Sequence, residues 1–245
     1  MKKTATICEL TVSLRIKPFA RDRRGFTLIE ILTAIFILAI VVSLALSAFN
    51  GIFSNADHIN DSSDLFEMGN ACLDRMAADL KAIYVLPYPR YQQPDIQDEK
   101  PDIYQVKGET RNVAGEDFAW LRFTSMAHLP LNHDAREGIA QLVYYVQKDA
   151  GGQFVLRRAD ALYPYPEFEE RDTDPVMCEQ ILGFSLTYYD AKGRELEEWD
   201  SQSEADEYGT PRRIGIKIAL GDKSTPYVFS TQISLPVYRY QPVKR

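Results

Sequence analysis

The segment Arg23-Arg24-Gly25-Phe26-Thr27-Leu28-Ile29-Glu30 is followed by a run, residues 31–56, that contains no charged side chain. Between Ile31 and Phe49 this run has twelve Ile, Leu, Val and Phe residues. At roughly −0.3 to −0.6 kcal/mol each, these residues favour membrane insertion by about 4 to 7 kcal/mol. One acidic residue such as Glu30 costs about 3 kcal/mol, so the run still predicts a helix that inserts into a bilayer.

The length and the flanks of the apolar run predict how it crosses the membrane. It has the roughly 20 residues that a helix needs to span a bilayer. A basic cluster precedes it, so the positive-inside rule places the N-terminus in the cytoplasm. The main alternative is a cleavable secretory signal peptide, whose apolar core would have ~7–15 residues and end at a small-residue cleavage site. Here the core is longer and the helical pattern continues beyond it.

Glu30 is unusual because an acid at the edge of a membrane helix is rare and needs a partner. If the chain is cut between Gly25 and Phe26, the new α-amino group of Phe26 lies about one helical turn from Glu30. The carboxylate is then neutralised within the chain or by a neighbouring subunit. A carboxylate that reaches the membrane interface is the alternative interpretation.

This arrangement of residues resembles the processing and methylation motif of type IV prepilins and pseudopilins. The resemblance implies that a prepilin peptidase cuts after Gly25 and that the new N-terminal residue, Phe26, is N-methylated. It also implies that Glu30 pairs with the amino terminus of an adjacent subunit during assembly. Residues 1–25 are then a leader peptide that is absent from the mature protein.

The charge distribution separates the leader from the remainder of the chain. Residues 1–25 carry a net charge of +5, and the whole chain carries −7, which leaves −12 for residues 26–245. Nucleic-acid recognition requires basic patches, so this acidic part is not expected to bind nucleic acid. The 245 residues, with 45% hydrophobic and 26% charged side chains, allow one or two globular domains.

The helical pattern continues well beyond the membrane segment. Apolar or small residues recur every three or four positions, which predicts one buried stripe on a polar helix. The stripe consists of Ile52, Ala56, Ile59, Ser63, Phe66, Leu73, Met76, Leu80 and Ile83. Pro87 and Pro89 are expected to end the helix. We therefore predict a transmembrane helix over residues 26–50 and an amphipathic periplasmic helix over residues 51–88.

Residues 89–245 are expected to form a β-rich head. Residues 88–115 are rich in Pro, Asp and Gln and are predicted to be loop, with at most a short strand at Ile103–Val106. Three hairpins then predict antiparallel sheet, and hence an α+β, pilin-like fold in which one sheet face covers the helix stripe. The expected strands are Phe118–Ser125, Ile139–Gln147, Phe154–Arg158, Ile181–Tyr189, Arg194–Trp199, Ile214–Leu220 and Tyr227–Leu235.

The head adds a second, looser resemblance, to the minor pseudopilin J of type II secretion systems. It rests on the segments Arg75–Leu80, Leu121–Ser125, Leu156–Arg158, Ile181–Asp190, Trp199–Ser201, Pro211–Ile214 and Leu235–Val237. It implies a single-pass protein of the bacterial inner membrane with its head in the periplasm. The implied partners are the prepilin peptidase, the minor pseudopilins I and K at the tip of a pseudopilus, and the major pseudopilin.

Two cysteines, Cys72 and Cys178, lie outside the leader and allow two interpretations. An oxidising periplasm permits a disulfide between them. Cys72 also lies at a helical core spacing, which is consistent with a buried free thiol. The sequence leaves both open.

No metal site or cofactor is expected. His128 and His133, with Asp134 beside the second, lack a third defined zinc ligand, and His58 lies far away in the sequence. The acidic segments Asp95–Glu99 and Glu195–Asp206 lack the spacing of a calcium loop and are expected to be solvated. The pairs Arg157-Arg158 and Arg212-Arg213 are expected to be surface charges at strand ends that pair with such acids.

The sequence therefore predicts a non-enzymatic assembly subunit, and only Gly25, Phe26 and Glu30 are assigned specific chemistry. A minor pilin of a type IV pilus or of a competence system is the alternative within the same superfamily. A membrane-anchored periplasmic enzyme or binding protein is the alternative of another class. No phosphate-binding Gly-rich loop, G-x-S-x-G elbow or C-x-x-C motif is present in the sequence to support the latter.

Overall fold

The computed structural model describes residues 25–87, 90–91, 102–130 and 136–240, with the backbone alone for residues 48 and 50–62. Helix α1, Leu28–Lys81, is the first element. The chain divides into two compact units, residues 1–56 and residues 57–245, which are described separately. The first unit contains the apolar part of α1, and the second contains its last turns and the head.

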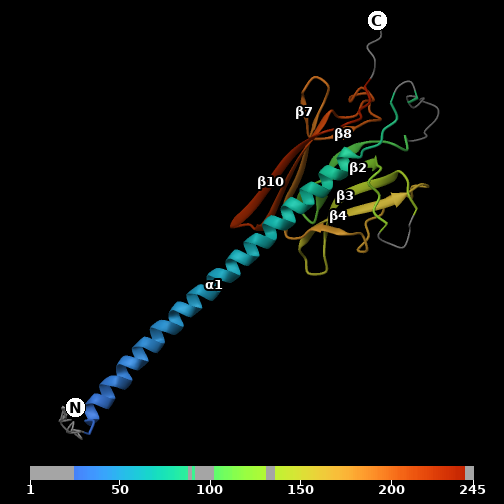
Figure 1. The fold of residues 1–245 in the computed structure, drawn as a ribbon. Helices are drawn as coiled ribbons and strands as arrows, with labels where there is room; N and C mark the ends of the chain where they lie inside the picture. The colour runs from blue at the N-terminus through green and yellow to red at the C-terminus, as the bar shows by residue number, and fades with distance from the viewer. Residues whose placement is uncertain (1–24, 88–89, 92–101, 131–135, 241–245) are drawn as a thin grey trace, which may run out of the picture. The chain divides into compact units, whose positions relative to one another are not determined.

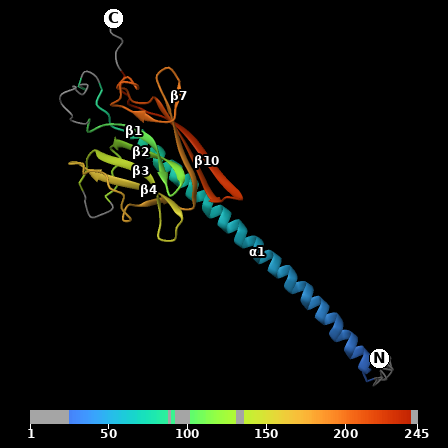
Figure 2. The same ribbon diagram turned by 180° about the vertical axis from the view of Figure 1, so that it is seen from behind.

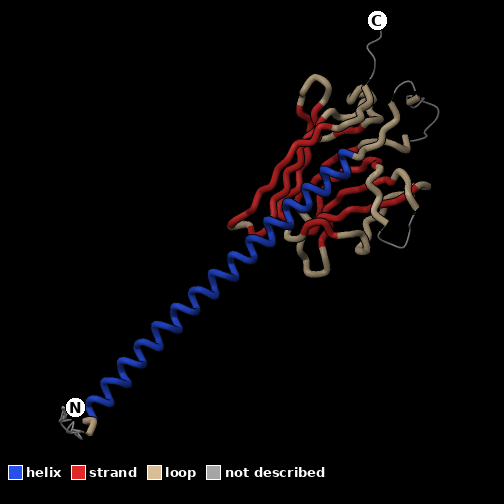
Figure 3. The backbone as a smooth tube through the Cα atoms, viewed as in Figure 1, coloured by secondary structure: helices blue, strands red, loops and turns tan. Residues whose placement is uncertain are grey.

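The head is built from two antiparallel sheets (Figures 1 and 3). The first sheet has the strand order β5-β4-β3-β2-β1-β8, and the second has the order β10-β9-β6-β7. The strands are β1 Lys107–Val113, β2 Glu116–Ser125, β3 Ala140–Lys148, β4 Phe154–Leu162, β5 Val176–Cys178, β6 Ile181–Tyr189, β7 Glu195–Leu196, β8 Trp199–Asp200, β9 Arg213–Asp222 and β10 Thr225–Ser234.

The last turns of α1 share one hydrophobic core with both sheets. Leu73, Met76 and Leu80 of the helix belong to the same cluster of buried side chains as Phe123 of the first sheet and Ile216 of the second. Figure 2 shows both sheets in front of this end of the helix. Burial of each such side chain stabilises the fold by about 1.5–3 kcal/mol. The predicted helix stripe is thus confirmed at Leu73, Met76 and Leu80, although it is covered by two sheets rather than one. Ile83 is buried as predicted but lies beyond the end of the helix, and Ser63 is exposed. The side chains of Ile52, Ala56 and Ile59 lie outside the described residues.

The stripe is interrupted where α1 passes β10. A Cβ atom at Gly69 would lie 2.5 Å from the ring of Phe229, so the absence of a side chain permits the close approach of helix and strand. Phe66 contacts the same ring, with 5.5 Å between the centroids, but remains mostly exposed. The predicted burial of Phe66 is therefore wrong, because Gly69 places Phe229 under the helix and leaves Phe66 at the edge of the contact.

The helix ends at Lys81, earlier than the residue 88 that the prolines predict. The backbone N–H of Tyr84 donates to the carbonyl of Thr124 at 2.8 Å, and Met126 N–H donates to Ala82 O at 2.9 Å. Ile83 forms an isolated bridge with Ser125. The chain leaves the helix because pairing with the end of β2 satisfies these backbone groups before Pro87 is reached.

The three predicted hairpins are confirmed as β3–β4, β6–β7 and β9–β10. Two strands were missed, β1 in the region predicted to be loop and the short β5. β1 has the sequence KGETRNV, which lacks apolar alternation, and its place is fixed by β2 on one side and β8 on the other. The predicted strand Arg194–Trp199 is also wrong, since it divides into β7 and β8, which belong to different sheets.

A buried ion pair joins α1 to the first sheet. The carboxylate of Asp79 accepts a hydrogen bond from Arg158 Nε at 2.6 Å and from Tyr144 Oη at 2.5 Å. Asp79, Tyr144 and Arg158 are each 0% exposed. Arg75, one turn before Asp79 on the helix, forms a second ion pair with the carboxylate. The three elements α1, β3 and β4 are therefore held at one charged centre.

The Asp79 centre extends along β4 to Asp160 and to the chain after β2. Arg158 Nη1 donates to Asp160 at 2.7 Å, and its Nη2 donates to the carbonyl of Ala127 at 2.9 Å. Burial alone would lower the pKa of the Arg158 guanidinium, but the hydrogen bond and charge of Asp79 raise it. The prediction that Arg157 and Arg158 are surface charges is therefore wrong, because both are buried and Arg158 has a carboxylate on either side.

Replacement of the Asp79 carboxylate is expected to destabilise the head. In Asp79→Asn, Arg158 loses its main counter-charge while remaining buried, which predicts a loss of about 3 kcal/mol in the free energy of unfolding. The measurement is urea unfolding of the full chain in detergent, followed by fluorescence of Trp120 and Trp199. Asp74→Asn, on the exposed face of the same helix, is the matched control and should change stability by less than about 0.5 kcal/mol. Equal stability of the two variants would contradict a structural role for the Asp79 centre.

Candidate processing and assembly site

The bond between Gly25 and Phe26 lies in exposed backbone that precedes the helix. Residues 25–27 have no regular secondary structure, and both Gly25 and Phe26 are exposed. A Cβ atom added at Gly25 would have no neighbour within 4 Å. The described part of the chain therefore does not itself require glycine at this position.

Thr27 begins the helix. Its carbonyl accepts from Glu30 N–H at 3.1 Å and from Ile31 N–H at 3.3 Å, and its hydroxyl oxygen accepts from Glu30 N–H at 3.4 Å. This is the geometry of an N-cap residue, which satisfies a backbone donor that has no partner within the helix. This capping role of Thr27 was not among the predictions from the sequence. The segment Thr27-Leu28-Ile29-Glu30 has the S/T-x-x-E spacing of a capping box, which is the local signal that indicates such a role.

Glu30 occupies the first turn of α1. A negative charge there is favoured by the positive end of the helix dipole, typically by 0.3–1 kcal/mol. Glu30 is exposed, and no ion pair is formed between it and another residue of the described ranges. An unpaired carboxylate is costly in a membrane, and the helix dipole alone does not offset that cost. This geometry leaves the Glu30 carboxylate open to a cation from outside its own helix.

The helix that follows is long and apolar enough to cross a membrane. The segment Leu28–Ser47 has 20 residues and a mean hydropathy of 2.7, and none of its most apolar window is buried within the chain. Thr33 lies inside this segment, where its hydroxyl donates to the carbonyls of Ile29 and Glu30, each at 3.0 Å. Its polar group is thus satisfied within the helix, as a lipid environment requires.

Of the three histidines, His128 is the one whose side chain the structure describes. His128 Nδ1 lies 2.6 Å from Asp160 Oδ1, next to the Asp79 centre. His133, Asp134 and the side chain of His58 fall outside the described residues. Within the ranges that are described, no group of three His, Cys, Asp or Glu side chains is arranged to hold a metal ion.

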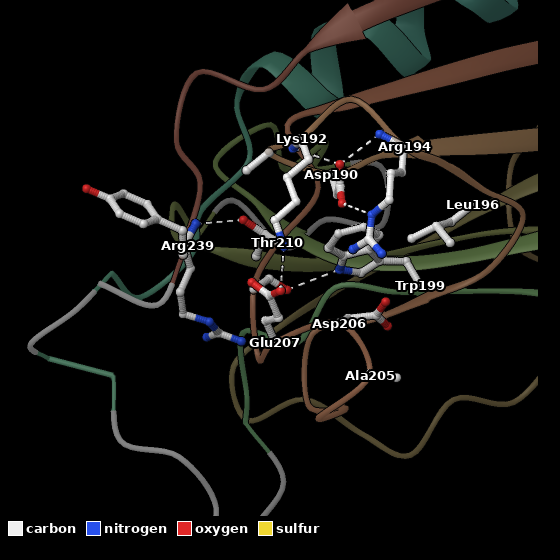
Figure 4. Close-up of a pocket in the computed structure, with 13 residues that line it drawn as sticks. Asp190, Lys192, Arg194, Leu196, Trp199, Ala205, Asp206, Glu207, Thr210 and Arg239 are labelled. Atoms are coloured by element: carbon white, nitrogen blue, oxygen red, sulfur yellow. Dashed lines mark hydrogen bonds and ion pairs between the residues drawn. The ribbon is translucent and has the colours of Figure 1, made fainter. Parts of the chain in front are cut away.

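The acidic segment Glu195–Asp206 borders a shallow pocket between the β6–β7 hairpin and the loop before β9 (Figure 4). Asp206 accepts the backbone N–H of Asp200 at 2.8 Å, Lys192 pairs with Glu207 at 3.1 Å, and Asp190 pairs with Arg194 at 2.6 Å. Burial raises the pKa of Asp206, and the hydrogen bond from Asp200 opposes this shift. Within the segment, Asp200 and Asp206 are partly buried and bond to the backbone of the loop, which was not predicted. The remaining acids are exposed, as predicted: Glu195, Glu197, Glu198 and Glu204. The other acidic segment, residues 95–99, lies outside the described ranges.

Arg239, near the C-terminal end of the described chain, lines the same pocket. The sequence did not predict a role for it. Its guanidinium pairs with Asp102 at 2.7 Å, donates to Ser201 O at 2.8 Å and stacks 3.5 Å from the ring centroid of Tyr91. Arg239 is almost fully buried. Its partners come from three distant parts of the chain, so no local pattern indicated its role, which is structural.

Two family models match the chain. The prokaryotic N-terminal methylation motif covers residues 20–46, which include Gly25, Phe26 and Glu30. The type II secretion system protein J model covers residues 47–230, and thus the larger part of the chain and nearly all of the described head. No curated protein matches the chain. A capped apolar helix that carries the methylation motif, joined to a head of the protein J type, identifies the chain as a member of the type II secretion system protein J family, a minor pseudopilin.

Proposed function

We propose that a prepilin peptidase processes this pseudopilin between Gly25 and Phe26, and that the mature chain joins the tip of a periplasmic pseudopilus. The observation that carries the proposal is the order of features at the N-terminus. An exposed non-helical segment, Gly25–Thr27, is followed by a capped helix with Glu30 in its first turn. Cleavage places the new α-amino group of Phe26 at the start of that helix, where N-methylation is proposed to follow.

We infer that α1 anchors the chain in the inner membrane by a single span, with the head in the periplasm. The basic residues before Gly25 support this orientation, because positive charge is retained on the cytoplasmic side. Assembly partners are then the minor pseudopilins I and K and the major pseudopilin. In this position Glu30 accepts the amino terminus of an adjacent subunit, which neutralises both charges within the membrane.

A structural role is favoured over catalysis by the way in which the polar groups of the head are used. The charged side chains around Asp79 and around Arg239 hold separate segments of the chain together. Two carboxylates of the shallow pocket of Figure 4, those of Asp190 and Glu207, are already in ion pairs, and Asp206 accepts a backbone hydrogen bond. These arrangements support assembly through the surface of a rigid head.

Replacement of Gly25 by a bulky residue is expected to block processing without altering the fold. In Gly25→Leu the added side chain meets no neighbour in the described structure, so any effect reports recognition by the peptidase. We expect the precursor to accumulate, measured by mass spectrometry of the membrane-bound protein as retention of residues 1–25. Thr27→Ser, which keeps the capping hydroxyl, is the control and should be processed normally. Normal cleavage of Gly25→Leu would contradict the proposed site.

Deletion of the gene tests the secretion role against the pilus and competence alternative. We expect the loss of at least one secreted exoprotein from the culture medium, with twitching motility and DNA uptake unchanged. Complementation with the full chain should restore secretion. Loss of motility or DNA uptake with normal secretion would favour the alternative, a minor pilin of another system.

Replacement of Glu30 separates insertion from assembly. Glu30→Leu should still insert, because the apolar run favours insertion without it, but its co-purification with the I and K partners should fall at least about tenfold, which corresponds to 1.4 kcal/mol. Thr27→Ala is the matched control, since it removes the helix cap, at a cost of about 1 kcal/mol, but keeps the carboxylate. If Glu30→Leu co-purifies as well as the wild type does, Glu30 has no pairing role. If Thr27→Ala shows the same loss, Glu30 acts through the capping box instead.

A further inference from the structure

Cys72 on α1 and Cys178 on β5 are two nucleophilic side chains that the proposed function does not use. Cys72 is 1% exposed and Cys178 is 0% exposed, and both belong to the core cluster shared by the helix and the sheets. The structure contains both as free thiols. The predicted burial of Cys72 is therefore confirmed, while the relation between the two sulfur atoms remains to be explained.

The two thiols meet at one turn of the helix. The Cys178 thiol donates to the carbonyl of Met68 at 3.8 Å. In an α-helix the carbonyl of residue 68 is also the acceptor for the N–H of residue 72, so this contact places the Cys178 sulfur beside the turn that carries Cys72. Hydrogen bonding to Cys178 is the largest of the causes that raise the pKa of the Cys72 thiol, which agrees with this placement of the two side chains.

The position of β5 against this turn is fixed on both sides. The backbone N–H of Glu179, the next residue, lies 3.4 Å from the sulfur of Met68. On the other side, Cys178 is the partner of Leu156 in the pairing of β5 with β4. Cys178 is therefore held beside the helical turn that carries Cys72, by its own strand and by the residue that follows it.

We propose that Cys72 and Cys178 are a disulfide modification site, oxidised as the exported head folds. The thiolate of one cysteine attacks the disulfide of an oxidant, a thiol–disulfide oxidoreductase or glutathione disulfide, and releases one thiolate of that oxidant. The thiolate of the other cysteine then attacks the mixed disulfide and releases the second. The two cysteines lose two protons and two electrons, and the oxidant is reduced to two thiols.

The same burial determines when the bond forms. The hydrogen bond with Cys178 and the burial of the group raise the pKa of the Cys72 thiol, so the thiolate is scarce in the folded head. Both thiols are also shielded from an external oxidant once the core has closed. Oxidation therefore occurs on the incompletely folded chain, and the bond then links α1 to a strand more than 100 residues away in the sequence.

The first test uses the full-length precursor in detergent micelles, which contains three cysteines including Cys8 of the leader. The reduced, denatured chain is refolded in a buffer of reduced and oxidised glutathione, denatured again, and labelled with a mass-tagged maleimide. One tag per chain is expected, and three tags would overturn the proposal. Cys72→Ala and Cys178→Ala should each carry two tags, and zero tags on either would show that Cys8 takes part instead and would also overturn it. The melting temperature of the oxidised chain should exceed that of the reduced chain by roughly 10 °C, as for a loop of about 100 residues.

The second test is made in cells, and it rests on the proposed periplasmic location of the head. The processed chain is trapped with acid, extracted from membranes and labelled in the same way. Because Cys8 leaves with the leader, zero tags are expected on the mature chain. Two tags on a mature chain whose cells secrete normally would overturn the disulfide while leaving the proposed function intact. An unprocessed chain in cells whose secretion is normal would instead count against the proposed function, and the refolding test would still decide the disulfide.

Discussion

The fold of the head depends on the carboxylate of Asp79, because this group is buried and its charge must be neutralised by groups packed around it. Arg158 and Arg75 supply the positive charge, and Tyr144 supplies a neutral hydrogen bond. Since a buried carboxylate without partners would cost several kcal/mol, the register of α1 against β3 and β4 is restricted to the one that brings these groups together. The apolar side chains of Met76 and Leu80 are buried in the same part of the helix, so the ion pair and the apolar core hold it together.

α1 meets two different requirements along its length. In the segment Leu28–Ser47 its apolar side chains are exposed and its hydroxyl at Thr33 is satisfied within the helix, which suits lipid. From Cys72 to Leu80 its apolar side chains are buried with those of the sheets and its one buried acid is paired. The same helix therefore combines a segment suited to a membrane, in which Thr33 is satisfied within the helix, with a segment suited to a protein core, in which Asp79 is paired.

The residues of the methylation motif lie at the start of the helix, and the buried ion pair of Asp79 lies at its end. Thr27 and Glu30 form a local motif in which the hydroxyl fixes the first turn and the carboxylate is left without a cation in the described part of the chain. The charged groups of the head, by contrast, have partners of their own around Asp79 and Arg239. The head is therefore held together by its own charged groups, and these are separate from the residues of the methylation motif.

The sequence by itself determined the features that depend on neighbours along the chain. These are the apolar span, the motif Gly25 to Glu30, the helix stripe from Leu73 onward and the three hairpins, since periodicity and turn residues are local signals. Only the tertiary structure decided the end of α1, the strand β1, the division into two sheets and the burial of Arg158 and Arg239. Each of these depends on a partner far away in the sequence: β2 ends the helix, β2 and β8 hold β1, and Asp79 makes a buried Arg158 possible. The residues next to a charged residue in a strand do not indicate whether a distant segment of the chain will supply a counter-charge.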